Sequence, residues 1–299
     1  MQVAKSFYTT FTHEFDVKGV EDVSCNFCRA AEFRLVCVES SFEVRTCLGC
    51  GLVYVSPQPT VEELPEFYDG MYADTSDAEM TARSMGAMEG HLKRIIRRRM
   101  PDGGRFLEVG CGNGRLLKTI ADLPLELTAI ELSESAADYA RRAVPRAAIR
   151  NLGIDSAEFP PGSQDCVALI AVLEHVKDPR AVLTKLCGWL APGGTIIIQV
   201  PYVQHFIRLK RWLPWLPVFF EAPRHLFDFS PRLLRGYLTE LGFTDIRIEI
   251  ARPYSSNGPI GTALIWVVKG IGLAIYAVTG GHYIYPFAAA TTTHAKLPA

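Results

Sequence analysis

An alternation of short apolar runs and amphipathic helical patterns between residues 105 and 200 constrains this chain more than any other feature. Strand-like runs lie at Arg105–Val109, Leu127–Glu131, Ala147–Arg150, Cys166–Ile170 and Thr195–Val200. Helical patterns lie between them at Arg115–Ala121, Ser133–Arg142 and Asp178–Trp189. This order predicts an α/β fold with a parallel, doubly wound sheet and helices on both faces. Ligands of such sheets bind beyond the carboxyl ends of the strands, so we expect a cofactor at the loops that follow them.

The loop after the first of these strands is rich in glycine and is preceded by an acid. Glu108 comes before Gly110, Gly112 and Gly114, which let the chain turn sharply and let a ligand lie against the backbone. The dinucleotide-binding pattern G-x-G-x-x-G requires a third glycine at position 115, where this sequence has arginine. A carboxylate beside the loop favours a ligand with a positive charge, such as a sulfonium or an amino group.

Two later strand ends carry further candidate binding residues. Glu131 ends the second strand, a position from which an acid accepts hydrogen bonds from ribose hydroxyls; a solvated acid is the alternative. Ile154 and Asp155 follow the third strand, where backbone N–H groups and a carboxylate suit the edge of an adenine. Residues 190–194, Leu-Ala-Pro-Gly-Gly, predict a turn directly before the fifth strand.

Four of the eight cysteines form two C-x-x-C pairs, Cys25 with Cys28 and Cys47 with Cys50. Each pair can present two thiolates from one tight turn, and two such turns can enclose a tetrahedral zinc ion. Four protein ligands leave no open position, so we expect a structural metal. Runs at 33–38 and 42–46 predict a hairpin between the pairs. Disulfides or unrelated buried thiols are the alternative, which the absence of a secretory-type apolar stretch in the first twenty residues disfavours.

In their order along the chain, these segments resemble the motifs of class I S-adenosylmethionine-dependent methyltransferases. The resemblance is carried by residues 108–114, 131, 161–165, 173–179 and 190–194. Residues 47–54, followed by prolines at 57 and 59, resemble a subgroup with an N-terminal zinc-binding segment, common among bacterial sugar, polysaccharide and natural-product methyltransferases. The resemblance implies a mostly parallel, seven-stranded Rossmann-like sheet, S-adenosylmethionine as cofactor and methyl transfer as the reaction. It does not specify the acceptor.

By position, the resemblance also implies which residues contact the cofactor. The glycine loop and Glu108 would contact the methionine part of the cofactor. Glu131 would bind the ribose, and the residues after the third strand would bind the adenine. Two residues after the fourth strand would line the pocket, and a tyrosine before the core, Tyr72 or Tyr68, would cap it. The expected set is Glu108, Gly110, Gly112, Gly114, Glu131, Ile154, Asp155, Leu173, Glu174 and Tyr72. Gln164 stands where the family usually has an aromatic residue, and we expect a local packing change there.

Two histidines are candidates for the general base that a hydroxyl acceptor requires. His175 follows the fourth strand, near the reactive end of the cofactor; a packing role is the alternative. His225 lies before a helix expected at Ser230–Leu241, and related methyltransferases have a similar Pro-x-His stretch near the acceptor. We therefore predict that His225 acts as base or orients the acceptor. Arg224 beside it is either solvated or binds an anionic group of the acceptor.

Two segments of the C-terminal half suit an apolar or amphiphilic partner. Residues 206–220 interleave tryptophan and phenylalanine with arginine and lysine, which suits either a lid over the active site or contact with a membrane surface. Residues 259–279 are almost wholly apolar but contain Lys269, which disfavours a membrane span. A buried helix, a subunit-pairing helix and a surface-associated helix stay open. If the tail at 285–296 supplies the last, antiparallel strand, residues 251–284 are an insertion.

The chain is therefore predicted to have four parts. These are a zinc-binding module at 20–58, a helical cap or linker at 59–100, a cofactor-binding core at 101–250 with an acceptor lid at 201–229, and an apolar insertion with the last strand at 251–299. We expect a cytoplasmic enzyme that methylates a small-molecule, sugar or lipid-linked acceptor. Peripheral membrane contact and a homodimer are further options.

Two other functions stay open at this point. Ubiquinone-type O-methylation is suggested by residues 173–179 and the apolar C-terminal half, but the cysteine module counts against it. RNA recognition or RNA methylation is suggested by the cysteine pairs and the basic run at 94–99. The formal net charge of −1 opposes a nucleic-acid partner.

Overall fold

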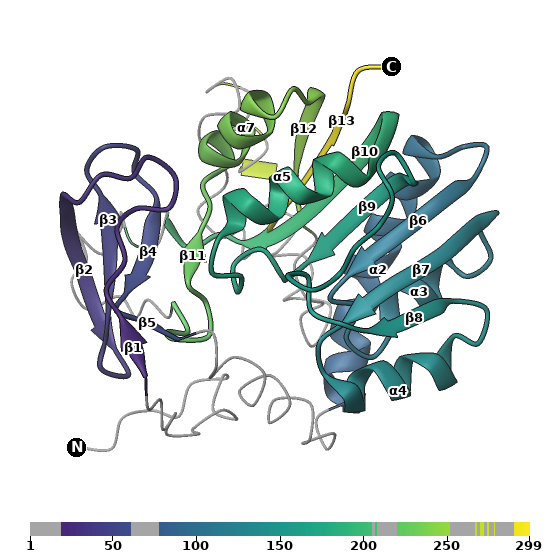
Figure 1. The fold of residues 1–299 in the computed structure, drawn as a ribbon, viewed down its shortest axis with the longest axis horizontal. Coiled ribbons are helices and arrows are strands. Elements are labelled where there is room, and N and C mark those ends of the chain that lie inside the picture. Colours follow the sequence, from purple (N-terminus) through teal and green to yellow (C-terminus); the bar gives the residue numbers. More distant parts are fainter. Residues whose placement is uncertain are drawn as a thin grey trace.

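The computed structural model describes residues 19–60, 78–204, 207, 220–251 and 290–299, together with residues 267, 270, 271, 274 and 278. A small β-module formed by residues 19–60 lies beside a larger α/β unit, and strand β11 (Phe227–Asp228) runs between them (Figure 1). The α/β class predicted from the alternation of strands and helices is confirmed.

The larger unit is built on a seven-stranded sheet with the order β12-β13-β10-β9-β6-β7-β8. Its strands are β6 (Gly104–Val109), β7 (Leu125–Glu131), β8 (Ala148–Asn151), β9 (Gln164–Ile170), β10 (Leu190–Pro201), β12 (Thr244–Ile250) and β13 (Ala290–Lys296). Strand β13 alone is antiparallel to its neighbours, as predicted for the C-terminal tail. The strand order reverses at β6, which has β7 on one side and β9 on the other, so the ligand-binding edge lies at the carboxyl ends of these strands.

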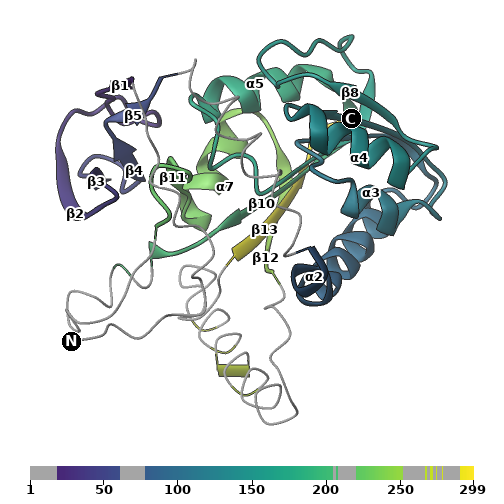
Figure 2. The same cartoon turned by 90° about the horizontal axis from the view of Figure 1, so that it is seen from below.

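Helices cover both faces of the sheet, and two apolar clusters show which helix covers which face. Leucine and isoleucine side chains of the first two helices pack with Phe106 in one cluster, and those of the last two pack with Leu107 in the other. Because Phe106 and Leu107 are neighbours on one strand, they point to opposite faces. Figure 2 shows the same separation. The described helices are α2 (Ala78–Arg99), α3 (Arg115–Ile120), α4 (Glu134–Ala143), α5 (Pro179–Trp189) and α7 (Pro231–Glu240).

Capping residues explain why three of these helices begin where the sequence predicted. The side chains of Ser133, Asp178 and Ser230 each accept a hydrogen bond from a backbone N–H in the first turn of α4, α5 and α7, respectively. Pro179 and Pro231 follow two of these caps, at helix positions where no backbone N–H is needed.

The small module is joined to the core by a shared sheet with the order β11-β4-β3-β2, in which β4 spans Val53–Ser56, β3 Phe42–Cys47 and β2 Phe33–Glu39. Strand β11 comes from the segment before α7 and pairs with β4 through Phe227 opposite Tyr54. Tyr54 belongs to the same apolar cluster as the α5 and α7 side chains. The ring of Phe27 packs edge-on against Tyr237 of α7 at 4.1 Å between centroids. The module is therefore part of the core packing.

The small module closes with a second strand pair, because β4 continues to Ser56 and β5 (Gln58–Pro59) pairs with β1 (Val20–Glu21). A proline is tolerated there because β1 and β5 form a two-stranded edge that needs few N–H donors. Residues 190–194 were expected to form a turn, but they begin β10, and an irregularity between Leu190 and Thr195 accommodates Pro192 and the glycines.

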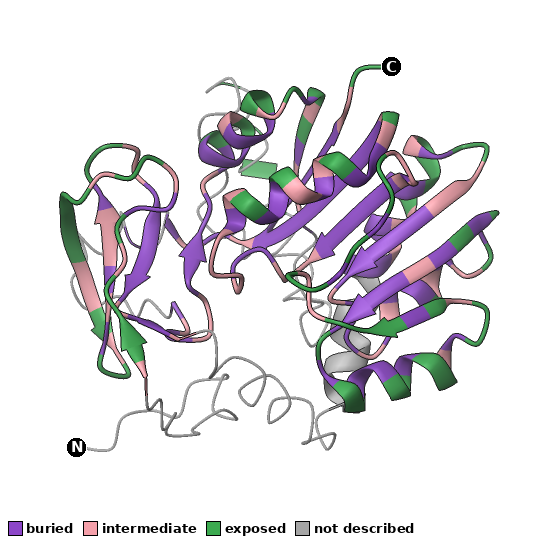
Figure 3. Cartoon of the chain, in the orientation of Figure 1, coloured by how far each residue is buried: buried purple, intermediate pink, exposed green. Residues whose placement is uncertain are grey.

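Figure 3 shows that the central strands are buried and that parts of β2 and α4 are exposed. Residues 61–77 of the predicted cap or linker and residues 208–219 of the predicted lid lie outside the described residues. In the predicted insertion, the helical positions Val267, Ile271 and Val278 are exposed. No helix in the described part of the chain is both long and apolar enough to span a membrane.

Candidate functional site

The loop between β6 and α3 has a backbone that only glycine adopts easily. Gly110, Gly112 and Gly114 have φ angles of 67°, 51° and 76°, which are in the left-handed region. A Cβ atom at Gly110 would lie 2.5 Å from Cγ2 of Val172, in the segment after β9. The first glycine thus lets the loop after β6 lie directly against the segment after β9.

Backbone hydrogen bonds hold this loop against the end of β7. The N–H of Gly110 donates to the carbonyl of Ile130 at 2.8 Å, and the N–H of Gly112 donates to Oε2 of Glu131 at 2.7 Å. The other carboxylate oxygen of Glu131 accepts the N–H of Ser133 at 2.9 Å. Glu131 is therefore held in one orientation by two backbone donors.

Glu108 supplies a buried carboxyl group next to the loop. Its side chain is almost fully buried, and its Oε2 has no hydrogen-bond partner among the described residues. Burial, together with the charges of Glu131 and Glu89, raises the pKa of Glu108 well above its usual range. A cationic ligand would stabilise the charged form of this carboxyl group. These features, with the open glycine turn, fit the ammonium and sulfonium groups of S-adenosylmethionine.

The end of β8 offers an apolar surface beside Glu131. Leu132 and Leu152 are exposed, and the side chain of Asn151 donates to the carbonyls of Glu131 and Leu132 at 2.9 Å each. Ile154 is half-buried next to them. Two exposed leucines at the carboxyl end of adjacent strands suit the faces of an adenine ring. The sequence prediction missed both leucines, although their position directly after strand ends was available as a signal.

A second polar cluster lies after β9 and consists of Glu174, His175 and His225. Nδ1 of His175 lies 2.7 Å from the carbonyl oxygen of Arg224, and Nδ1 of His225 lies 3.0 Å from that of Phe220. Since a carbonyl only accepts, each Nδ1 carries the proton and each Nε2 is the basic nitrogen. The two imidazole rings are 4.9 Å apart. Nε2 of His175 lies 3.9 Å from Oε1 of Glu174.

Burial determines the charge of all three groups. It lowers the pKa of His175 to about 3, with His225 contributing, and it lowers the pKa of His225 to about 4, with Arg224 contributing. Both imidazoles are therefore neutral at pH 7. Burial raises the pKa of Glu174 to about 8, and neither of its carboxyl oxygens has a hydrogen-bond partner among the described residues.

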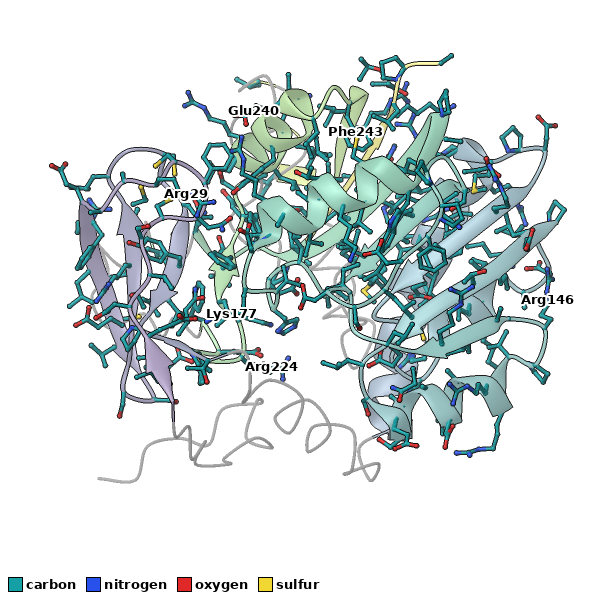
Figure 4. The ribbon with its side chains drawn as sticks, in the orientation of Figure 1. Arg29, Arg146, Lys177, Arg224, Glu240 and Phe243 are labelled. Atoms are coloured by element: carbon teal, nitrogen blue, oxygen red, sulfur yellow. The ribbon has the colours of Figure 1, made fainter. Side chains whose placement is uncertain are left out.

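The chain segments that carry the cluster connect the core to the small module. The carbonyl of Glu174 accepts the N–H of Leu226 at 2.8 Å, which places the segment of His225 beside the end of β9. Nζ of Lys177 donates to the carbonyl of Pro59 at 2.6 Å and lies 2.7 Å from a carboxylate oxygen of Glu21. Figure 4 shows Arg224 and Lys177 at this junction between the two parts of the molecule.

The four predicted cysteines converge in the small module. The Sγ atoms of Cys25 and Cys50 are 3.4 Å apart, as are those of Cys28 and Cys47, and all four sulfurs lie within 4.8 Å of one another. These distances exceed the ~2.0 Å of a disulfide bond. They approach the ~3.8 Å between sulfurs in a tetrahedron with Zn–S bonds of ~2.3 Å. The donor set therefore fits a thiolate-bound metal ion.

Comparison with known proteins decides the family. A model of a methyltransferase domain matches residues 85–248, which is more than half of the chain. The chain belongs to the methyltransferase-domain family.

Similar proteins agree with this placement and leave the acceptor undefined. The ubiquinone biosynthesis O-methyltransferase of Xanthomonas campestris pv. campestris is 36% identical over 102 residues, which cover 32% of this chain and 43% of that protein. An uncharacterized methyltransferase of Mycobacterium bovis is 32% identical over 125 residues, which cover 41% of this chain and 63% of the relative. The match thus spans less than two thirds of either protein.

Solved structures show the same fold at low identity. This chain is similar to a chain in the complex between the Haloferax volcanii Trm112 methyltransferase activator and a methyltransferase. The TM-score is 0.58 and the identity 17%, and the match covers 78% of this chain and 98% of the chain in the complex. An S-adenosylmethionine dependent methyltransferase of Listeria monocytogenes is similar with a TM-score of 0.52 and 17% identity, covering 72% and 99%.

The methyltransferase fold brings most of the predicted site residues to one edge of the sheet, with exceptions. Leu173 is fully buried in the apolar core, whereas Ala171 and Val172 before it are more exposed, so its place in the cofactor pocket stays a prediction. Asp155 is exposed, and its described contact is the backbone carbonyl, which accepts from Lys185. Tyr72 and Tyr68 lie outside the described residues.

Sequence reasoning also missed a buried acid from α2. Glu89 is buried near Glu108 and pairs with Arg115 at 2.8 Å. Its position in α2, nineteen residues before Glu108, gave no signal, since only the packing of α2 against α3 brings it to the loop. Gln164, at the position where an aromatic was expected, is buried and donates to Ser163.

Proposed function

We propose that this methyltransferase transfers the methyl group of S-adenosylmethionine to a hydroxyl group of a small-molecule, sugar or lipid-linked acceptor. The observation that carries the proposal is the proximity of two unlike sites at the carboxyl ends of β6, β7 and β9. The first is a glycine loop with two buried acids, Glu108 and Glu131, and the second is the cluster of Glu174, His175 and His225. The contact between Gly110 and Val172 joins them.

The first site is suited to hold the cofactor. Glu108 would bind the ammonium group, Glu131 the ribose hydroxyls, and Leu132 and Leu152 the adenine. When bound, S-adenosylmethionine supplies a methyl group that is activated by the sulfonium charge. The residues of the chain then have to align the acceptor and remove its proton.

The second site is suited to receive the acceptor. Its imidazoles are neutral at pH 7, and Nε2 of His225 is the nitrogen that can take a proton, because Nδ1 donates to the carbonyl of Phe220. A hydroxyl needs such a group, because an alcohol at neutral pH is a weak nucleophile. Arg224 is held by Glu221 at 3.0 Å and would favour an acceptor that carries an anionic group.

The four-cysteine cluster would bind one structural zinc ion. The module that contains it supplies β4, on which β11 and the segment of His225 are built. Zinc removal is therefore expected to disturb the acceptor site as well as the module itself. Zinc can be removed with a strong chelator and measured by metal analysis alongside thermal unfolding.

Two observations favour a ubiquinone-type acceptor as a second candidate. The partial match to the Xanthomonas ubiquinone biosynthesis O-methyltransferase supports O-methylation of this type, and the exposed apolar side chains of Val267, Ile271 and Val278 suit contact with a lipid surface. Peripheral membrane contact and a homodimer through this segment remain proposals.

Calorimetric titration tests the proposed function. The purified, zinc-loaded protein is titrated with S-adenosylmethionine and separately with S-adenosylhomocysteine, and micromolar binding of both is expected. The loaded enzyme is then offered glycosides and prenylated phenols with a radiolabelled methyl donor. A folded protein that binds neither cofactor form would refute the proposal.

A further inference from the structure

Glu174, His175 and His225 form a cluster of metal-ligating atoms that the sequence did not predict. In the part of the chain that the structure describes, two groups of three or more such residues lie within ligand distance, and the four cysteines are the other. One ligand atom from each of the three residues lies within 4.8 Å of the other two. Glu174 and His175 follow β9, whereas His225 comes from the segment before β11, fifty residues later.

Both histidines are oriented as metal ligands usually are. In metal sites, a ligating histidine commonly donates its other ring N–H to a carbonyl or a carboxylate, which fixes the tautomer and the ring. Here Nδ1 of His175 donates to the carbonyl of Arg224, and Nδ1 of His225 donates to the carbonyl of Phe220. The Nε2 atoms are thereby assigned to the cluster.

The buried carboxyl group of Glu174 also favours a bound cation. Its side chain is 0% exposed, and both carboxyl oxygens lack a hydrogen-bond partner among the described residues. Burying a carboxyl group without partners costs free energy, whereas a cation would satisfy both oxygens. The cluster lies beside the glycine loop, since Val172, two residues before Glu174, packs against Gly110.

The charges around the cluster permit a cation. Glu221 brings a second carboxylate to 3.9 Å from Nε2 of His225. The guanidinium of Arg224, which would repel a cation, is paired with this same carboxylate at 3.0 Å. A cation would favour the ionised form of Glu174, which with two neutral imidazoles would bring a formal charge of −1 to the bound ion.

We propose that Glu174, His175 and His225 bind one divalent transition-metal ion, which holds oxygen atoms of the acceptor. Two imidazoles and one carboxylate suit zinc, manganese or iron, and three protein ligands leave coordination positions open. The ion would act as a Lewis acid that lowers the pKa of a bound hydroxyl. In this arrangement His225 contributes as a ligand, and the hydroxyl proton leaves to solvent. The inference rests on the proposed function, because it places the ion beside the methyl donor.

The test is a metal titration of the full chain, with its cysteine cluster already loaded with zinc. Binding of Mn²⁺ is monitored by electron paramagnetic resonance, and binding of Co²⁺ by visible absorption. Manganese disfavours thiolates, so it separates this site from the cysteines. We expect one ion per chain. The variants Glu174→Gln and His225→Ala should weaken binding ~10–100-fold, the range seen when metal-site groups are lost.

A control variant is His91→Gln, since His91 is also buried and lies 3.3 Å from a carboxylate, that of Glu249, but is outside the cluster. It should leave metal affinity unchanged. Cofactor affinity, measured on every variant, reports that the sheet edge is folded. The proposal is overturned if neither metal binds to the wild-type chain, or if binding is the same in Glu174→Gln and His225→Ala. Loss of cofactor binding in the wild-type chain would instead refute the proposed function.

Discussion

The cofactor end and the acceptor end of this site are built in opposite ways. At the cofactor end, Gly112 and Ser133 satisfy the carboxylate of Glu131 with backbone donors, and each element follows directly from its own strand. At the acceptor end, Glu174 is sealed from solvent without hydrogen-bond partners among the described residues, and His225 arrives from a distant segment. The carboxylate of Glu131 is preorganised by backbone donors, whereas the acceptor end is assembled by tertiary packing. Polar groups buried in this state are where specificity and chemistry are usually located.

The largest effect expected from a change at the acceptor end is the loss of turnover in His225→Ala. Removal of a general base or of a metal ligand for the acceptor should lower turnover ~10²–10⁴-fold, while cofactor affinity stays within about twofold. Steady-state rates and calorimetry on the same preparation measure both quantities. Full activity would rule out a role of His225 in the reaction.

Gly110→Val should disturb both ends of the site, because it changes the contact between the glycine loop and the segment after β9. The new Cβ atom would meet Val172, and a β-branched residue is strained at a φ angle of 67°. A cost of about 2–4 kcal/mol is expected, shared between unfolding free energy and cofactor binding. Gly188→Ala, at a helical position with open space around it, serves as the control. If Gly110→Val binds the cofactor normally, the loop does not form its binding surface.

The acceptor histidines should give the protein an acid-sensitive stability. Their pKa values in the folded state, about 3 for His175 and about 4 for His225, are below the ~6.5 of an exposed histidine. The unfolded chain therefore binds these protons first, and stability falls as the pH drops from about 6.5 toward about 4. His225→Asn should remove its share, on the order of 3 kcal/mol, and flatten the profile of Tm against pH.

Glu249 also makes the stability depend on pH, but in a more acidic range than the two histidines. A hydrogen bond from His294 lowers the pKa of Glu249 to about 2, so its contribution is lost at lower pH, below its unfolded value of ~4.5. Burial raises the pKa of Glu174 to about 8, so this carboxyl group titrates in the same window with the opposite sign. The contribution of His225 is therefore read from the difference in Tm between wild type and His225→Asn from pH 4.5 to 7.5. Equal slopes for wild type and His225→Asn in this range would contradict its assigned burial.

The smallest effect is expected from Glu131→Ala at the cofactor end. Loss of charged hydrogen bonds should weaken cofactor binding by about 1.5–3 kcal/mol, which corresponds to roughly 10–150-fold in Kd. Glu126→Ala removes an exposed acid from the same strand and should leave Kd unchanged. An unchanged Kd for the cofactor in Glu131→Ala would refute the assignment of Glu131 to the ribose. It would also remove the contrast drawn between the cofactor end and the acceptor end.

The cofactor end was predictable because its determinants are local in sequence. Glu108, the three glycines and Glu131 each lie within a few residues of a strand end, where backbone geometry dictates the residue type. The same holds for the four cysteines, whose spacing within each pair suffices to make a turn. Leu132 and Leu152 were missed although they are equally local, because an exposed leucine gives no pattern of its own.

What the sequence determined by itself is the α/β order, the glycine turn, the helix starts at Ser133, Asp178 and Ser230, and the cysteine pairs, since each follows from contacts over a few residues. Only the tertiary structure decided that β11 joins the small module to the core, that Glu89 reaches Glu108, and that His225 meets Glu174 and His175. These contacts join segments from about 20 to 170 residues apart, and packing of apolar surfaces selects them without leaving a periodic trace in the chain.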